Sequence, residues 1–381
     1  MREIGVVGVG QSNFSRGCRM RVPELAFEAF KEAMQDAKLT TADIDASIVC
    51  SSMYDPQRSP EGTISDYLDL APKPTLLVEN ACTAGTSGVK LAWSLIKSGL
   101  HKVVAVIGVE KMSGQDSREV AEMMGRTYDI TWESSAGFTM PSGYAMHARA
   151  CMAKYGLTEE QLAKVRVKNS FYGCKNAKAA YQKQLSLGDI MQSEQVASPL
   201  KKFDCCANAD GASCTILAAA DICRGITTTP VWILGIGSGS DTQISRRTSY
   251  TSFLSVRTAV ERAYGMAGVR PADIDVAEVH DCFTIAELIA YEDLQFCARG
   301  EAATLIEGKE TYVGGRMPVN VDGGLLSKGH PIGATGGSQT RTIVKQLRGE
   351  MGETQVKNAK IGLVHNVGGV GHYCNIIIFG R

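Results

Sequence analysis

The chain has 381 residues, a length that suits two domains of ordinary size better than one small core. Hydrophobic residues make up 44% and charged residues 21% of the sequence, as expected for a soluble globular protein. Because 40 Lys and Arg residues balance 40 Asp and Glu residues, no net charge would draw the molecule to nucleic acid or to a membrane. An anionic ligand must therefore be held by a local group of basic side chains.

No segment is apolar for long enough to cross a bilayer, because the longest plainly apolar run is 103–107 and a span needs about 20 residues. The first five residues include an acid and lead into no long apolar core, so we expect no secretory signal. The twelve cysteines are scattered rather than spaced as in a disulfide scaffold, which predicts reduced thiols and a cytoplasmic location. Cys205 and Cys206 lack Cys-x-x-Cys spacing, so we expect no metal in this chain.

The sequence contains an internal duplication at an offset of 230 positions. Residues 29–45 align with 259–275 without a gap and share seven identities, including Ala-Asp-Ile-Asp at 42–45 and 272–275. Composition alone would give about one or two identities. Each half predicts a strand (4–9; 231–236), a helix (23–37; 256–267), a second strand (46–50; 276–280), a turn that opens a helix (82–86; 330–335) and a buried strand (103–109; 361–364).

The alternation of strands and helices predicts an α/β fold, and the continuously apolar strands indicate sheets that are covered on both faces. The duplication lapses after residue 110, and we interpret the following segment as an insertion into the first half. The predicted division is 1–110 with 203–224 for the first half, 111–202 for the insertion and 225–381 for the second half.

The insertion carries helical patterns at 145–155 and 158–169, and insertions on a duplicated scaffold commonly build the substrate site. Its basic residues either contact an anionic ligand or form a solvated helix face. Its aromatic residues point either to a bulky substrate group or to core packing. The basic residues are Lys164, Arg166, Lys168, Lys175, Lys178 and Lys183, and the aromatic ones are Trp132, Phe138, Phe171, Tyr172 and Tyr181.

Cys82 is the first candidate for chemistry. It lies where an extended stretch gives way to a small-residue turn and a helix, so the helix dipole is expected to lower the thiol pKa and favour a nucleophilic thiolate. The alternative is a buried, inert cysteine. A second candidate is the segment 278–283, where a strand end directs His280 and Cys282 toward the ligand crevice of an α/β layer. The alternative there is a structural pair in which Asp281 caps the next helix.

Two glycine-rich segments of the second half complete the candidate site. His330, within 324–336, occupies nearly the place in the second half that Cys82 occupies in the first. Two related helix starts would then bring together a thiol and a histidine that can take its proton. The segment 365–371 offers backbone amides for a developing oxyanion, or is a plain glycine-rich loop. The Gly-x-Gly runs at 8–10 and 235–237 lack the third glycine of a dinucleotide fingerprint.

These features, in this order on a duplicated chain, resemble the thiolases, and above all the sterol-carrier-protein-type and archaeal-type thiolases. The resemblance covers essentially the whole chain and rests most on Gly329-His330-Pro331 together with His280-Asp281-Cys282-Phe283. It implies the thiolase fold, with two duplicated βαβαβαββ halves in five α-β-α-β-α layers and an inserted loop domain. It also implies an acyltransferase that cleaves a 3-oxoacyl-CoA with coenzyme A, or catalyses the reverse Claisen condensation, through an acyl-cysteine.

The resemblance assigns a role to each candidate residue. Cys82 would be the nucleophile, and His330 would activate it and donate to the thioester oxygen. His280 would hold a water in the same oxyanion hole, and the amides of Cys82 and Gly368 would form a second hole. Many thiolases have a catalytic Cys-x-Gly where this chain has Asn-Val-Gly at 366–368, so Cys282 would supply the acid that protonates the leaving enolate.

Coenzyme A would be the co-substrate, and we expect Lys164, Arg166, Lys168 and Ser238 to contact it. The resemblance implies a homodimer, and it leaves two alternatives for the coenzyme: a small zinc-ribbon and OB-fold partner protein binds part of it, or the chain is self-sufficient and its insertion holds the whole coenzyme. Aryl-substituted or branched 3-oxoacyl-CoA substrates are candidates, among them benzoylsuccinyl-CoA. The alternatives are another condensing synthase of the superfamily, which would need no acid such as Cys282, and a non-catalytic subunit of an acyl-CoA enzyme complex.

Overall fold

The computed structural model describes residues 3–52, 57–114, 116–226 and 229–381. Within them, nine strands form one sheet in the order β3-β2-β4-β7-β1-β8-β11-β10-β9, and β5 (Gln195–Ala197) and β6 (Leu200–Lys201) form a separate hairpin. The first five strands of that order are β3 (Thr75–Val78), β2 (Ala46–Cys50), β4 (Val103–Glu110), β7 (Gly211–Ala219) and β1 (Ile4–Gln11). The other four are β8 (Val231–Ser240), β11 (Tyr373–Gly380), β10 (Ile361–Gly368) and β9 (Val276–Glu278).

The two halves of this sheet are built alike. In the first half β2 runs parallel to β3 and β4, and β7 runs antiparallel to β4 and β1. In the second half β9 runs parallel to β10, and β11 runs antiparallel to β10 and β8. The halves join only briefly, where Gly5 and Val6 of β1 pair with Trp232 and Val231 of β8. The duplicated sequence therefore folds as a duplicated structure.

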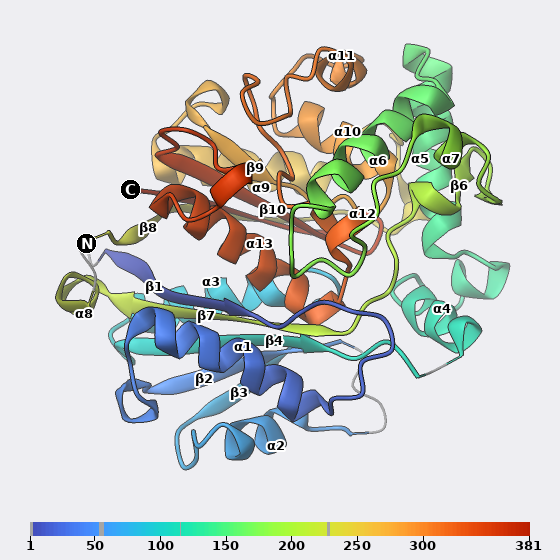
Figure 1. Cartoon of the computed structure of the whole chain (residues 1–381). Coiled ribbons are helices and arrows are strands. Elements are labelled where there is room, and N and C mark those ends of the chain that lie inside the picture. Colours follow the sequence, from blue (N-terminus) through green and yellow to red (C-terminus); the bar gives the residue numbers. More distant parts are fainter. Residues whose placement is uncertain (1–2, 53–56, 115, 227–228) are drawn as a thin grey trace.

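Helices and sheet halves stack in five layers, which confirms the predicted thiolase-type architecture (Figure 1). α1 (Val22–Ala37) packs on the outer face of the first half-sheet. α3 (Ala84–Lys97) and α13 (Ile332–Arg348) lie between the two half-sheets and share one apolar cluster with both. α9 (Leu254–Ala267) and α10 (Thr284–Asp293) pack on the outer side of the second half-sheet.

The small residues in the duplicated helices let each outer helix lie directly on a glycine of its sheet. A Cβ added to Gly10 of β1 would come 2.1 Å from the carbonyl oxygen of Ala29, and one added to Gly237 of β8 would come 1.8 Å from that of Ala259. Ala29 and Ala259 are equivalent at the offset of 230. The Gly-x-Gly runs thus serve helix–strand packing.

The repeated Asp-Ile-Asp turn has an equally local purpose. The carboxylate of Asp45 accepts hydrogen bonds from the amides of Lys102 and Val103 at 2.6 and 2.9 Å, at the start of β4. In the second half the carboxylate of Asp275 accepts from the amides of Lys360 and Ile361 at 2.8 and 2.9 Å, at the start of β10.

The insertion follows β4 of the first half in the sequence, but it packs against the second half. It comprises α4 (Ser117–Gly125), α5 (Met140–Tyr155), α6 (Glu159–Gly173), α7 (Leu187–Met191) and the β5–β6 hairpin. α6 packs against α10, α11 (Ala302–Glu307) and α12 (Gly324–Lys328). The chain then returns to the first half-sheet as β7 and continues into α8 (Ala220–Ile226). The division at residues 110, 202 and 224 stays a prediction.

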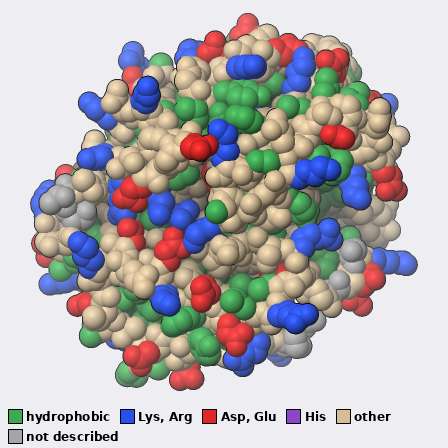
Figure 2. Space-filling view, in the orientation of Figure 1, with side chains coloured by type: hydrophobic (Ala, Val, Ile, Leu, Met, Phe, Trp, Pro, Cys, Tyr) green, Lys and Arg blue, Asp and Glu red, His purple; other side chains and the backbone are tan. Residues whose placement is uncertain are grey.

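Neither the described helices nor the visible surface suggests a membrane span or a polyanion site. No helix among the described residues is long and apolar enough to cross a bilayer. On the face shown in Figure 2, Lys and Arg side chains are interspersed with Asp and Glu, with no broad area of one charge.

α2 (Pro60–Tyr67) covers part of the first half-sheet beside α1 (Figure 1).

Candidate active site

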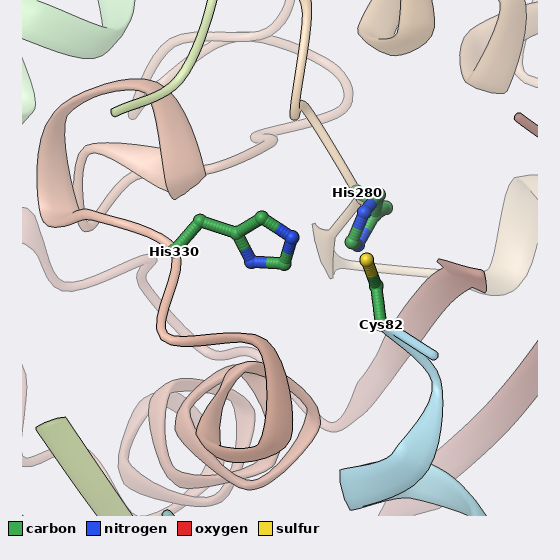
Figure 3. A group of neighbouring side chains, drawn as sticks. All are labelled: Cys82, His280 and His330. Carbon is green, nitrogen blue, oxygen red and sulfur yellow. The ribbon is translucent and has the colours of Figure 1, made fainter. Parts of the chain in front are cut away.

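Three side chains from three separate segments meet where the two halves face each other. Cys82 precedes α3, His280 follows β9 and His330 precedes α13. The Cys82 sulfur and one ring nitrogen of each histidine all lie within 4.8 Å of one another, and all three residues are buried. Figure 3 shows the Cys82 sulfur directed at the His280 ring, with the His330 ring extending toward both from the left. The structure therefore brings together the cysteine and both histidines that the sequence singled out.

A tight turn presents the thiol. Ala81 adopts a left-handed backbone conformation with φ of 47°, which a non-glycine residue adopts only at a cost in free energy. The Glu79 carboxylate accepts a hydrogen bond from the Ala81 amide at 2.7 Å, and the Thr83 hydroxyl donates to the Asn80 carbonyl at 2.6 Å. These bonds hold Cys82 just before the first turn of α3.

The hydrogen bonds of His330 make it a base toward Cys82. The Thr335 hydroxyl donates its single proton to the Pro331 carbonyl at 3.0 Å. It must therefore accept from Nδ1 of His330, which lies 2.6 Å away. Nε2 of His330 is then left with a free lone pair. Burial lowers the pKa of His330 to about 3, so the ring is neutral at physiological pH and keeps this lone pair.

His280 has the opposite tautomer. The Asn366 side-chain amide nitrogen lies 3.0 Å from Nδ1 of His280, which accepts from it, so Nε2 carries the proton. This Nε2 is buried and has no hydrogen-bond partner among the described residues. Burial, followed by the nearby His330 and His365, holds the pKa of His280 well below its ordinary value. The second histidine is thus a neutral donor that faces the thiol.

The resting form of Cys82 differs from the expectation. Burial raises the pKa of the Cys82 thiol to about 12, and hydrogen bonds from the amides of Gly369 and of Cys82 itself offset this only in part. The predicted thiolate is therefore wrong for the resting site, because burial raises the thiol pKa by more than the backbone hydrogen bonds lower it. Cys82 and His330 form a neutral thiol–imidazole pair in which the thiolate arises only when the proton moves.

The amide that bonds to the thiol is that of Gly369, one residue beyond the predicted Gly368. Gly368 ends β10 and pairs with Tyr373. Gly369 has a φ of 61°, a left-handed conformation that favours glycine, and its amide bonds to the Cys82 sulfur. The Tyr144 hydroxyl donates to the Gly369 carbonyl at 3.0 Å and the Arg247 guanidinium donates to the Val370 carbonyl, so both fix this loop. The role of Gly368 in an oxyanion hole stays a prediction.

Cys82 lies between two cavities. A cavity of about 390 Å³ opens on one side and has polar lining residues that include Ser52, Asn80 and Arg126. A smaller, mostly apolar cavity of about 170 Å³ contacts both Cys82 and Cys282. Burial keeps the pKa of the Cys282 thiol well above its ordinary value, while a hydrogen bond with Tyr144 lowers it. The smaller cavity is also lined by Met124, Met140, Tyr144, Cys205, Cys206, Asn208, Phe283 and His330.

Three of the residues expected to bind coenzyme A are engaged elsewhere. Lys168 is fully buried and forms an ion pair with Glu287, and Arg166 is buried and donates to the Leu326 carbonyl. The prediction for these two is therefore wrong, because their partners lie inside the protein. Lys164 is partly exposed and pairs with Glu307 at 2.8 Å and with Glu160 at 3.7 Å.

The fourth expected contact, Ser238, lies in a separate depression. Its hydroxyl accepts from the Lys90 ammonium at 2.9 Å and donates to the Asn375 side-chain oxygen at 2.7 Å. That depression shares Asn80 and Tyr373 with the larger Cys82 cavity. A contact between Ser238 and the coenzyme stays a prediction.

The five aromatic residues that the sequence singled out in the insertion do not line the Cys82 cavities. Trp132 is 77% exposed, and Tyr172 packs between Phe171 and Tyr312. The aromatic rings at the smaller cavity are instead Tyr144 and Phe283, which stack with centroids 4.5 Å apart. Phe283 belonged to a recognisable motif, and Gly369 lies in the segment 365–371 that was expected to offer amides, whereas no local signal marked Tyr144 or Thr335 as site residues.

Cys82, His280 and His330 are also the one group among the described residues that is spaced to hold a metal ion. A thiolate and two imidazoles suit a soft divalent ion such as zinc. The same atoms are those needed as nucleophile, base and donor. The absence of a catalytic metal stays a prediction.

The fold and this thiol–imidazole site define an acyltransferase. The sequence of residues 6–221 matches the family model for the thiolase N-terminal domain, and residues 237–381 match the model for the thiolase C-terminal domain-like family. The chain therefore belongs to the thiolase family, and it is an acyltransferase with thiolase function.

Several named proteins are similar to this chain. The chain is 38% identical to an acetyl-CoA acetyltransferase of Methanothermobacter thermautotrophicus over 385 residues, covering 100% of both chains. It is 33% identical to sterol carrier protein 2 of Bos taurus, covering 95% of this chain and 69% of the relative. Among solved structures it resembles the Ltp2-ChsH2(DUF35) aldolase, with a TM-score of 0.87, 26% identity and coverage of 100% and 98%.

Proposed function

We propose that this enzyme cleaves a 3-oxoacyl-CoA with coenzyme A, using Cys82 as nucleophile, His330 as its base and Cys282 as the second acid. The observation that carries the proposal is the neutral Cys82–His330 pair, with the free lone pair of His330 facing the thiol. Such a pair stores the nucleophile as a thiol and releases it when substrate is in place.

The steps follow from the atoms at the site. His330 takes the Cys82 proton as the sulfur attacks the 3-oxo carbon, and the amides of Cys82 and Gly369 stabilise the oxyanion. When the carbon–carbon bond breaks, the Nε2 proton of His280 and the protonated His330 stabilise the enolate oxygen of the leaving acyl-CoA. Cys282 gives the enolate carbon its proton. Coenzyme A then transfers its thiol proton to the Cys282 thiolate and attacks the acyl-Cys82. The protonated His330 returns its proton to the departing Cys82 sulfur, which restores both cysteines and the neutral base.

The smaller cavity supports an aryl or branched acyl group as the substrate class. It measures about 170 Å³. An engineered apolar cavity of about 150 Å³ in another protein binds benzene. The cavity is lined by the Met140 and Phe283 side chains, which suit an aromatic ring. Benzoylsuccinyl-CoA is one candidate of this class. A condensing synthase would use the same nucleophile without Cys282, and the presence of Cys282 at the cavity favours a thiolase.

A partner protein and a homodimer complete the proposal. Arg126 is the only Lys or Arg among the described residues that line the larger cavity, whereas coenzyme A carries several phosphate charges. A small zinc-ribbon and OB-fold partner would supply the remaining contacts.

The edge strand β3 ends the first half-sheet and exposes Leu76, so it offers a surface for a second copy. All twelve cysteines are described and none is in a disulfide, which supports a cytoplasmic location.

Intact-mass measurement after rapid mixing with substrate tests the chemistry. Acetoacetyl-CoA and 3-oxo-3-phenylpropanoyl-CoA provide a small and an aryl acyl group. The wild type should gain the mass of the matching acyl group on Cys82, faster with the aryl substrate, and Cys82→Ser should gain none. An adduct that maps to another cysteine, or no adduct with either substrate, would show that the proposal is wrong.

A further inference from the structure

Asp281 is a buried carboxylate between two residues of the site, His280 and Cys282. It does not cap the helix that follows it, since the N-cap of α10 is Phe283. Its oxygens instead accept hydrogen bonds from the amides of Leu325 and Leu326, at 2.7 and 3.1 Å. One side chain of the His280 segment thus holds the first turn of α12.

α12 leads directly into His330. It ends at Lys328, and Gly329, with a φ of 103°, makes the turn to the histidine. The contact with Asp281 leaves no free space, because a Cβ added to Gly324 would come 2.2 Å from an Asp281 oxygen. Any displacement of the Asp281 carboxylate must therefore move the start of α12, and with it the base of the site.

A second buried group holds Asp281 itself. The Asn169 side-chain amide donates to Asp281 at 2.7 Å and to Glu287 at 2.8 Å. Glu287 forms the buried ion pair with Lys168 and accepts from the Asn320 side-chain amide at 2.8 Å. The oxygen of the same Asn320 side chain accepts from the Val279 amide at 2.8 Å, next to His280. The polar network therefore closes on the segment from which it began.

Burying these charges is costly, and apolar residues of similar volume would stabilise the fold at least as well. The hydrogen bonds instead give directional control over two backbone segments that both carry catalytic groups. Burial and the neighbouring Glu287 raise the pKa of Asp281 to about 7, while the two α12 amides and Lys168 lower it, so the charged form depends on these partners.

We propose that Asp281 is a positioning residue that sets the separation of His330 from Cys82 through α12, with Lys168 and Asn169 of the insertion holding it in place. The proposal rests on the proposed thiolase function. It assigns the basic residue Lys168 to the support of the active site rather than to coenzyme A.

The test measures acylation of Cys82 by quenched-flow mass spectrometry with acetoacetyl-CoA and 3-oxo-3-phenylpropanoyl-CoA. Asp281→Asn keeps the shape of the side chain but removes the charge that the α12 amides bind. It should lower the maximal acylation rate about 10- to 100-fold, while the substrate concentration that gives half the maximal rate changes less than about threefold. Asn169→Ala, which removes one donor to Asp281 but leaves the carboxylate, should give a smaller loss of the same kind.

Asp293→Asn is the matched control. Asp293 is buried and accepts from a backbone amide, that of Phe253, at 2.8 Å, but no described interaction links it to α12. The Asp293→Asn variant should lose about as much thermal stability as Asp281→Asn, but it should keep the wild-type maximal acylation rate. Two results together would show that Asp281 has only a structural role. Asn169→Ala would acylate at the wild-type rate, and Asp281→Asn would either acylate at that rate or fail to fold. If the wild type acylates with neither substrate, the proposed function is wrong instead.

Discussion

At the scale of single residues, the site depends on two histidines with opposite tautomers, each set by one neighbour. Thr335 leaves His330 a free lone pair, and Asn366 leaves His280 a proton to donate. Because burial lowers the pKa of His330 to about 3, the folded protein keeps this ring neutral where the unfolded chain, with an ordinary pKa of 6.5, takes up a proton. This difference contributes stability above pH 6.5 that is lost progressively as the pH falls from 6.5 toward 3.

This predicts that the His330 ring does not titrate between pH 5 and 9 in the folded protein. The chain has only six histidines, so ring signals in a nuclear magnetic resonance titration can be assigned by single replacements such as His330→Asn. His280 should likewise stay neutral over this range. A His330 titration near the ordinary value of 6.5 would show that the ring is solvated and would contradict the neutral pair.

A second residue-scale prediction concerns the proton donor. Cys282→Ala should lower the maximal thiolysis rate by about 100-fold or more with little change in substrate affinity, because the leaving enolate lacks its acid. It should also abolish exchange of the acetyl-CoA methyl protons with deuterated water, which runs the same proton transfer backwards. Cys206→Ala, in the same cavity, is the matched control and should retain both activities. Wild-type exchange by Cys282→Ala would place the acid elsewhere.

At the scale of elements, the paired glycine–alanine contacts explain why the two outer helices lie so close to the sheet. Gly237→Ala would place a methyl group 1.8 Å from the Ala259 carbonyl oxygen, so α9 must move. We expect the free energy of unfolding to fall by about 1–3 kcal/mol. Gly265 lies in α9, and a carbon added to it would have no atom within 4 Å. Gly265→Ala should therefore raise the free energy of unfolding by about 0.5–1 kcal/mol. Urea unfolding of both variants checks this, and equal effects would contradict the packing argument.

The same elements show what sequence alone can predict. The layered fold and the meeting of Cys82 with His330 followed from a duplication that is visible in the sequence, because equivalent helix starts in two similar halves face each other. The surroundings of Lys168 could not be predicted from the duplication, because its partner Glu287 is 119 positions away in the sequence. The pKa of Cys82 was predicted in the wrong direction because the helix dipole is a local property, whereas desolvation depends on everything that covers the thiol.

At the scale of the whole molecule, several basic residues of the insertion are engaged with other parts of the protein. Lys168 and Arg166 are buried, Lys178 pairs with Glu32 of α1, and Lys175 pairs with Glu353. These basic residues are held by carboxylates or carbonyls in different parts of the structure. Arg126 is the one Lys or Arg among the described residues that line the larger Cys82 cavity, so this cavity offers few cations to the phosphates of a coenzyme A bound there.

The chain purified alone should therefore bind coenzyme A weakly, with a dissociation constant of about 0.1 mM or more by calorimetric titration. Co-purification with a zinc-ribbon and OB-fold partner should tighten binding at least about tenfold, since the partner would add contacts to the phosphates. Pantetheine, which has the same thiol arm but no phosphate, is the matched control, and the partner should leave its affinity unchanged. Arg126→Gln should weaken coenzyme A binding further without affecting pantetheine. Micromolar binding of coenzyme A with full thiolysis by the chain alone would show that no partner is needed, because the chain would then supply every phosphate contact itself.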